Sequence, residues 1–351
     1  MPAQRLAKRI VNWQRKHGRN HLPWQNTRDP YRVWLSEIML QQTQVATVID
    51  YYHRFLARFP SVKDLAQADI DEVLALWAGL GYYARARNLH ACAKAVMRDW
   101  QGQFPLSAAQ LQVLPGIGAS TAAAIAAFCG GERSAILDGN VKRVLTRHFA
   151  IDSDITKSST TKLLWEIAQR EVPSQQHTKS EPDAMARYTQ GMMDIGATVC
   201  MRTKPKCDLC PLKQSCEARR RGAPEQFPVK STKQRRKPER DLELLWLTCA
   251  GHVLLQKRPT TGVWGGLWCL PSDKTLATKL GLGDPLRMAS FAHELSHFRM
   301  VITPWRLDAM PQLQTLPAVV GEDLHWVPIN KLANYGLPKP VRELLVGGND
   351  R

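Results

Sequence analysis

Residues 114–120 read LPGIGAS and residues 137–144 read LDGNVKRV, and these two runs decide the fold of the first part of the chain. The first run predicts a glycine-containing turn that leads directly into a helix. Such a turn leaves backbone N–H groups free at the helix N-terminus, where they can hold a phosphate. Asp138 stands just before an apolar-periodic segment, where a helix N-cap is expected. The local pattern therefore leaves two interpretations open, a capped helical hairpin or an anion-binding turn followed by a carboxylate.

The charge of the chain favours a polyanionic partner. The formal net charge is +17 over 351 residues. Residues 241–351 carry 11 basic and 10 acidic residues, which leaves 37 basic and 21 acidic residues, a net charge of +16, in residues 1–240. Nucleic acid is the simplest partner for such a surface, and a solvated basic surface is the alternative.

Targeting signals and cysteine usage limit the class of protein to which the chain can belong. The N-terminus is charged from Arg5 onward, so it does not read as a signal peptide, and the longest apolar run, around residues 121–129, is too short for a membrane span. We therefore expect a soluble cytoplasmic protein, associated with the nucleoid. In a reducing compartment its eight cysteines are expected to be metal ligands or core residues rather than disulfides.

Three segments follow from the pattern of the chain. Residues 1–218 predict an all-α domain, residues 219–240 a basic, proline-marked linker, and residues 241–351 an α+β domain with turns at Gly251 and at Gly265-Gly266. The helices predicted from apolar spacing cover Arg5–His17, Val33–Ile49, Ile70–Trp77, a segment from Ala84, 155–171, 183–199 and a short stretch near Thr275–Leu282. The predicted strands cover Leu242–Thr248, Val253–Gln256, Leu267–Leu270 and Met300–Leu307.

Four cysteines lie close together in the sequence with the spacing of metal ligands. Six, two and five residues separate them, and nothing around them is apolar enough to explain four core cysteines. Four thiolates suit either Zn²⁺ or an iron–sulfur cluster, and the spacing alone leaves both open. The four residues are Cys200, Cys207, Cys210 and Cys216.

Taken together, the turn, Asp138 and the cysteine spacing resemble the helix-hairpin-helix DNA glycosylase superfamily with a C-terminal [4Fe–4S] loop. Residues 34–45 (WLSEIMLQQTQV), 79–87 and 137–144 resemble the motifs of MutY-type adenine DNA glycosylases. The resemblance implies a helix-hairpin-helix at residues 110–130 and a [4Fe–4S] cluster held by the four cysteines of residues 200–216. It also implies a monomeric enzyme acting on double-stranded DNA, from which it flips adenine mispaired with 8-oxoguanine or guanine.

Two carboxyl groups fit the chemistry of base excision. Breaking an N-glycosidic bond through an oxocarbenium-like sugar needs one acid for the leaving base and one ionised carboxylate for the cation. Glu37 lies among apolar residues, so burial should raise its pKa and let it act as the acid. By resemblance Asp138 stabilises the sugar cation and Asn140 orients the site. A surface glutamate and a plain N-cap aspartate are the alternatives.

Ser120 indicates the reaction type. Related endonuclease-III-type enzymes have a lysine nucleophile at this position, and a hydroxyl cannot form a Schiff base. The resemblance therefore implies a monofunctional glycosylase that does not cleave the strand. The DNA contacts that it implies are the wedge residues Gln42 and Tyr82 with Leu80 nearby, the backbone contacts Gly116, Gly118 and Ser120, and the phosphate contact Lys142.

The C-terminal domain resembles the Nudix fold of the MutT type at residues 265–271 (GGLWCLP). A Nudix hydrolase needs clustered glutamates to hold Mg²⁺, and residues 244–293 contain none, so we expect no pyrophosphohydrolase activity. By resemblance this domain recognises 8-oxoguanine through Ser296 and His297. The family has phenylalanine where this chain has Leu295, so stacking at that position is lost.

The sequence leaves three competing functions. A bifunctional glycosylase/lyase acting on oxidised pyrimidines is disfavoured by Ser120 and by the glutamine-rich segment after Glu37. A non-catalytic DNA-binding protein leaves the placement of Glu37 and Asp138 unexplained. A Nudix hydrolase lacks its carboxylates. The favoured function is hydrolysis of the adenine N-glycosidic bond during base excision repair.

Overall fold

The structure is a computed structural model that divides into two compact units, and we describe each unit separately. The domain boundaries predicted near residues 218 and 241 stay a prediction. Among the described residues, no helix is long and apolar enough to cross a membrane. The first unit consists of residues 2–66 and 91–231, and the second of residues 67–90, 237–309 and 323–347.

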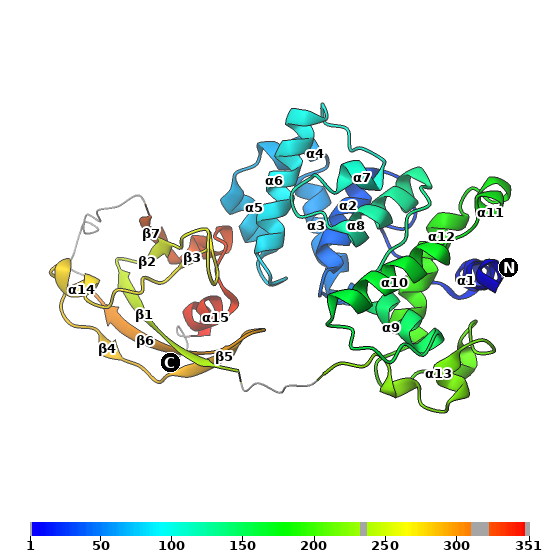
Figure 1. Ribbon diagram of the computed structural model, residues 1–351. Coiled ribbons are helices and arrows are strands. Elements are labelled where there is room, and N and C mark those ends of the chain that lie inside the picture. The colour runs from blue at the N-terminus through cyan, green and yellow to red at the C-terminus, as the bar shows by residue number, and fades with distance from the viewer. Residues whose placement is uncertain (1, 232–236, 310–322, 348–351) are drawn as a thin grey trace. The chain divides into compact units, whose positions relative to one another are not determined.

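Helices and connecting loops form the first unit (Figure 1). Helix α6 (Ala84–Asp99) begins in the second unit and ends in the first. The first unit contains α1 (Pro2–His17), α2 (Pro30–Leu40), α3 (Val45–Arg58), α4 (Val62–Gln67, which ends one residue beyond the unit), α7 (Ala108–Leu111), α8 (Ala119–Ile125), η1 (Ala126–Gly130), α9 (Gly139–His148), α10 (Ser158–Arg170), α11 (Gln175–Ser180), α12 (Ala184–Asp194), η2 (Ile195–Val199), η3 (Cys207–Leu209), α13 (Glu217–Arg220) and η4 (Pro224–Gln226).

The single helix predicted over Val33–Ile49 is wrong, because the structure has two helices there. Helix α2 ends at Leu40 and α3 begins at Val45. Between them Gln42 has a left-handed backbone with φ 58°. A non-glycine residue rarely adopts that conformation, and it cannot continue a right-handed helix. No glycine or proline marks the break in the sequence.

The residues at the N-terminus of α2 fix where the helix begins, and that start determines which face of the helix carries Glu37. Asp29 caps the helix by accepting a hydrogen bond from the backbone N–H of Tyr31 at 3.0 Å, and proline occupies the first helical position. The neighbours Trp34 and Leu35 are fully buried. The apolar face of α2 therefore packs into the unit and carries Glu37 inward with it.

The core of the first unit joins helices that are far apart in the sequence. Helices α1 and α12 pack so closely that a Cβ on Gly191 would lie 2.6 Å from Cγ2 of Ile10. Ala122, Ala123 and Ala124 of α8 are buried, as expected for a helix that approaches its neighbours closely. Burying one large aliphatic side chain stabilises the fold by about 2 kcal/mol. Buried members of this core include Leu6, Ile10, Ala124, Leu145, Leu164, Met185 and Ile195.

The second unit contains a mixed β-sheet (Figure 1). The parallel pair β1 and β6 forms its centre, with Leu245 opposite Trp305, and β2 pairs antiparallel with β1. The order β3-β2-β1-β6-β4 is extended by β5 on β6 and by β7 on β2. The strands are β1 (Glu239–Cys249), β2 (His252–Lys257), β3 (Trp268–Cys269), β4 (Leu286–Arg287), β5 (Phe291–Glu294), β6 (Arg299–Asp308) and β7 (Leu324–Pro328).

The predicted change from all-α to α+β structure is confirmed in the described residues. The first strand begins at Glu239, and the four predicted strands correspond to β1, β2, β3 and β6. The helix predicted near residue 275 is a single turn. The helical elements of this unit are α5 (Ile70–Trp77), the start of α6, α14 (Leu276–Lys279), η5 (Ile329–Asn334) and α15 (Lys339–Gly347).

Candidate active site

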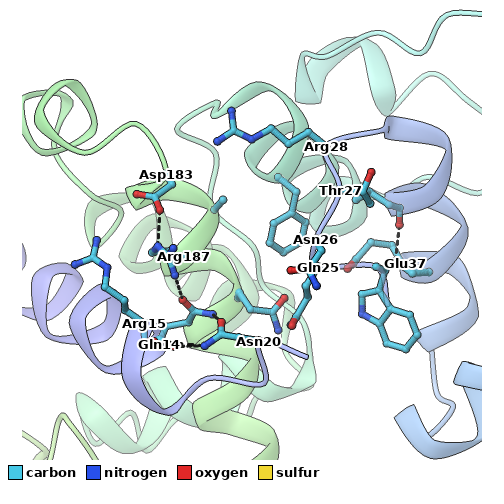
Figure 2. A pocket seen from close by; sticks show the side chains of 16 residues that line it. Gln14, Arg15, Asn20, Gln25, Asn26, Thr27, Arg28, Glu37, Asp183 and Arg187 are labelled. Atoms are coloured by element: carbon cyan, nitrogen blue, oxygen red, sulfur yellow. Dashed lines mark hydrogen bonds and ion pairs between the residues drawn. The ribbon is translucent and has the colours of Figure 1, made fainter. Parts of the chain in front are cut away.

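A pocket of about 430 Å³ opens in the first unit beside Glu37 (Figure 2). Its wall comes from the end of α1 and the turn after it, from α2, and from α12. A chain of hydrogen bonds lines one side: Arg187 donates to Gln14 Oε1 at 3.1 Å, and Gln14 Nε2 donates to Asn20 Oδ1 at 2.7 Å. The pocket therefore has a polar wall whose groups are already oriented.

The opposite side of the pocket carries polar groups that the protein leaves unpaired. The Oε1 and Nε2 atoms of Gln25 are buried, and neither has a hydrogen-bond partner among the described residues. Trp24, next to it, is 6% exposed and also lines the pocket. A buried amide without partners costs about 1–3 kcal/mol. A ligand with both a donor and an acceptor on one edge would remove that cost.

Glu37 presents a carboxyl group to this pocket in an environment that disfavours its charge. Glu37 is half-buried and lines the pocket. Desolvation by burial, together with the smaller effect of the nearby charge of Asp138, raises the pKa of Glu37 from 4.5 to about 8. The group is therefore protonated at neutral pH, as its apolar neighbours in the sequence predicted.

Asp138 is the N-cap of α9, as predicted. Its Oδ1 accepts a hydrogen bond from the backbone N–H of Val141 at 2.7 Å, and its Oδ2 accepts one from Asn140 Nδ2 at 3.2 Å. These two bonds fix the orientation of the carboxylate. Asn140 therefore contacts the carboxylate of Asp138 directly.

Arg143, one turn further along α9, holds Asn140 in turn. Its Nη2 donates to Asn140 Oδ1 at 2.8 Å and to the carbonyl of Gly196 at 2.6 Å, and its Nε donates to the carbonyl of Cys200 at 2.7 Å. A Cβ on Gly196 would lie 2.5 Å from Cβ of Asn140, so glycine is needed there for η2 to approach α9. Arg143 therefore connects the cysteine segment to the carboxylate through Asn140.

The turn at residues 114–118 leads into α8 as expected. Gly116 has φ 76°, a conformation that favours glycine, and Gly118 is the N-cap residue. A Cβ on Gly118 would meet nothing within 4 Å, so packing within the chain does not require glycine there. The Oγ of Ser120 accepts a hydrogen bond from the backbone N–H of Leu137 at 3.0 Å. Ser120 thus fixes the backbone immediately before Asp138.

The four cysteines line one small cavity together with Arg147. Arg147 is 2% exposed, and its Nη1 donates to Cys200 Sγ at 3.3 Å and to the carbonyl of Met201 at 2.6 Å. In the part of the chain that the structure describes, no three His, Cys, Asp or Glu side chains form a group that could hold a metal ion. The thiols are nevertheless gathered around one space, in which burial raises the pKa of Cys207, Cys210 and Cys216 above its ordinary value.

The remaining DNA-binding candidates lie in both units. In the first unit Gln42 occupies the break between α2 and α3, and Lys142 is half-buried on α9. In the second unit Leu80 is buried, whereas Tyr82 is 47% exposed and has φ 49°. The Tyr82 hydroxyl lies 2.9 Å from the Oγ of Ser296 in that unit. His297 is exposed beside Ser296 in the turn between β5 and β6.

The sequence prediction missed several residues of this site. Gln25, Gln190 and Asn20 line the pocket with Glu37 but were not proposed. The only signal for Asn20 and Gln25 is the polar character of residues 18–28, which is ordinary in a loop, and Gln190 lies within α12, where no local pattern marks it. Arg143 stands inside a quoted motif, but its hydrogen bonds to the cysteine segment depend on contacts across the fold.

Two protein families match the chain. The model for the helix-hairpin-helix superfamily of base excision DNA repair proteins matches residues 35–170, and the model for the NUDIX domain matches residues 244–346. The solved structure of a thermostable thymine-DNA glycosylase superposes with a TM-score of 0.54 at 28% identity. That superposition covers 61% of this chain and 95% of the other.

Characterised relatives match most of the chain. A protein of Buchnera aphidicola (subspecies Baizongia pistaciae), described as adenine DNA glycosylase, is 37% identical over 350 residues, covering 96% of this chain and 94% of the relative. The human protein of the same description is 35% identical over 321 residues, covering 75% of this chain and 56% of the relative. The similarity therefore extends through both units.

Proposed function

The chain belongs to the adenine DNA glycosylases of the helix-hairpin-helix superfamily, and from this premise we propose that it acts as a monomer on mispaired duplex DNA. In this proposal it hydrolyses the N-glycosidic bond of adenine opposite 8-oxoguanine or guanine. The observation that carries the proposal is Glu37, a carboxyl group with a pKa of about 8 that faces a pocket. Excision of a base needs an acid of this kind at neutral pH.

The pocket supplies recognition of the flipped base. A nucleobase taken out of the stack is read by hydrogen bonds to its edge and by stacking on apolar walls. The unpaired amide of Gln25 and the indole of Trp24 provide both kinds of contact beside Glu37. Adenine presents an amino donor and ring-nitrogen acceptors on its edges. Such an edge would satisfy the amide that the protein leaves unpaired.

Glu37 and Asp138 have different roles in the proposed reaction. Glu37 gives its proton to the ring of the departing adenine. The base then leaves as neutral adenine, whereas without this proton it would leave as an anion. Asp138, oriented by Asn140 and by the backbone of α9, stabilises the positive charge that develops on the sugar. Once Glu37 has lost its proton it can accept one from the attacking water. The products are free adenine and an abasic site.

The proposed reaction stops at the abasic site. The hydroxyl of Ser120 accepts a hydrogen bond from Leu137 and offers no amine to the sugar. A bifunctional enzyme needs an amine nucleophile that forms a Schiff base and then cleaves the strand. The alternative, a glycosylase/lyase acting on oxidised pyrimidines, is therefore disfavoured.

The four cysteines fit an iron–sulfur cluster. Cys200, Cys207, Cys210 and Cys216 line one cavity, and Arg147 donates to the sulfur of Cys200. We propose that they hold a [4Fe–4S] cluster, which would fix the segment between η2 and α13. Visible absorption together with about four iron atoms and an equal amount of acid-labile sulfide per chain would support the cluster. Stoichiometric zinc without sulfide would refute it.

The C-terminal unit is proposed to read the partner base. Ser296 and His297 are exposed in one turn and can both hydrogen-bond a base edge. If they read 8-oxoguanine, S296A with H297A should reduce the preference for 8-oxoguanine over guanine opposite adenine. The rate on the guanine mispair should change less than the rate on the 8-oxoguanine mispair. Equal losses on both mispairs would contradict this role.

One assay tests the main proposal. The protein is incubated in excess with a duplex that holds a single 8-oxoguanine:adenine pair, and adenine release and strand breakage are measured with and without hot alkali. We expect adenine release, with strand breakage only after alkali. Breakage before alkali would refute the monofunctional assignment, and release of an oxidised pyrimidine in place of adenine would establish the alternative.

Variants assign the roles of the two carboxyl groups. E37Q and D138N should each reduce single-turnover release by about 10³-fold or more, while binding to the mispaired duplex survives. E166Q is the matched control, because Glu166 is an exposed glutamate on α10 of the same unit. It should release adenine at the wild-type rate. Near-normal turnover in E37Q or D138N would exclude the assigned role.

A further inference from the structure

Gln190 lines the pocket with Glu37 and is held in one orientation by Asp194, one turn later on α12. Its Nε2 lies 2.9 Å from Oδ1 of Asp194, in a buried hydrogen bond. The two ends of a glutamine amide differ chemically, and an ionised carboxylate can only accept hydrogen bonds. The amino end of Gln190 must therefore face Asp194, and its carbonyl oxygen is the end left for the pocket.

Asp194 is itself fixed from several directions. It is fully buried, and it forms an ion pair with Arg19 in the turn after α1. The Nε of Arg19 donates to Oδ1 at 2.7 Å, and the backbone N–H of Arg19 donates to Oδ2 at 3.0 Å. With Gln190, three donors converge on one carboxylate. The carboxylate therefore cannot turn to offer Gln190 a different partner.

The orientation of this amide decides which purine the pocket can accept. Adenine carries an amino group at C6, which is a hydrogen-bond donor, whereas guanine and hypoxanthine carry a carbonyl oxygen there. A carbonyl oxygen fixed in the pocket attracts the amino group and repels the carbonyl. A freely turning amide would accept either base, because its amino end could face a carbonyl group.

We propose that Asp194 is a positioning residue that makes the pocket selective for 6-aminopurines over 6-oxopurines by fixing the amide of Gln190. The inference rests on the proposed function, in which this pocket receives the flipped base. Asp194 does not touch the base and acts through Gln190. Arg19 keeps the carboxylate in place and does not itself set the selectivity.

The test compares two bases that differ at C6. Single-turnover release of adenine and of hypoxanthine is measured from matched duplexes, each with the base opposite 8-oxoguanine. Wild type should release adenine faster. In D194N the new side chain can donate as well as accept, so Gln190 can turn, and the ratio of the two rates should fall by about tenfold or more.

A matched control separates this role from the stability that the ion pair provides. R19K keeps a positive charge beside Asp194 but loses the guanidinium geometry, while the bond between Gln190 and Asp194 remains. Its adenine-to-hypoxanthine ratio should stay at the wild-type value even if its melting temperature falls. A ratio that collapses equally in R19K and D194N would overturn the inference.

A double-mutant cycle tests whether Asp194 acts through Gln190. Q190M removes the amide and should lower the ratio by itself. D194N introduced into Q190M should then lower the ratio no further, because there is no amide left to orient. A second, independent drop of the same size would contradict the inference.

The remaining outcomes are also decisive. If D194N lowers both rates equally and leaves the ratio unchanged, Asp194 is purely structural and the inference fails. If D194N does not fold, D194E replaces it: a longer carboxylate still only accepts, so the ratio must be retained, and its loss would refute the inference. If wild type releases no adenine at all, the proposed function itself has failed.

Discussion

Replacing Glu37 by glutamine should stabilise the folded protein while it abolishes adenine release. The pKa of Glu37 is about 8 in the folded chain and 4.5 for an ordinary glutamate. Between these pH values the folded chain keeps the proton and the unfolded chain has lost it. The folded state therefore binds more protons in this window, and the free energy of unfolding falls as pH rises through it.

The size of the effect follows from that window. At about 1.4 kcal/mol per pH unit, the cost that Glu37 imposes on the folded state reaches about 5 kcal/mol above pH 8 and vanishes below pH 4.5. Glutamine has a similar shape and no charge to desolvate. The free energy of unfolding of E37Q should therefore exceed that of wild type by up to about 5 kcal/mol at pH 8.5, and the two proteins should become equally stable near pH 4.5.

Thermal unfolding of the two proteins, measured from pH 4.5 to pH 8.5, checks this prediction. For a unit of this size the difference at pH 8.5 corresponds to about 10 °C in melting temperature. E166Q, which removes an exposed carboxylate from the same unit, should follow the wild-type curve at every pH. The reasoning is refuted if E37Q is no more stable than wild type at pH 8.5, or if its advantage does not change with pH.

Four further predictions concern activity and cofactor. Adenine release should be constant from neutral pH to about pH 8 and fall about tenfold per pH unit above it, as Glu37 loses its proton; a single-turnover pH profile checks this. S120K should introduce strand cleavage that borohydride can trap, whereas S120A, which loses the bond to Leu137, should lose about 1 kcal/mol of stability and cleave nothing without alkali. R143Q loses the charge-assisted hydrogen bonds to Asn140 and to two backbone carbonyls. It should therefore lose about 2–3 kcal/mol of stability in denaturant titrations and release adenine more slowly. Wild-type stability and rate in R143Q would contradict the connection from the cysteine segment through Arg143 to Asp138. C210S should lower bound iron and the melting temperature together, and unchanged iron would exclude Cys210 as a ligand.

The parts of the site that depend on local pattern could be predicted from the sequence. Asp138 was recognised as an N-cap because capping depends on residues within one turn. The raised pKa of Glu37 followed from apolar neighbours on the same helix. The four thiols gather because they are close together in the chain.

The rest depends on contacts that no local pattern records. Gln190 lines the pocket because α12 packs on α1, and the contacting residues Ile10 and Gly191 are 181 positions apart in the chain. The break after α2 was missed because Gln42 adopts φ 58° without a glycine or proline to mark it. Strands β4, β5 and β7 were missed because they are two to five residues long and are partly exposed or flanked by polar residues, so their alternation is weak.

The pocket draws its wall from outside the segment that the glycosylase family model matches. That segment, residues 35–170, contains Glu37 and Asp138, but Gln25 precedes it and Gln190 follows it. A fragment trimmed to the match would keep both carboxyl groups and lose these parts of the pocket wall. Helix α1 packs against Gly191 and supplies Gln14 to the pocket, so the proposed site depends on it. A fragment that retains the proposed site must therefore include α1 and extend at least through α12.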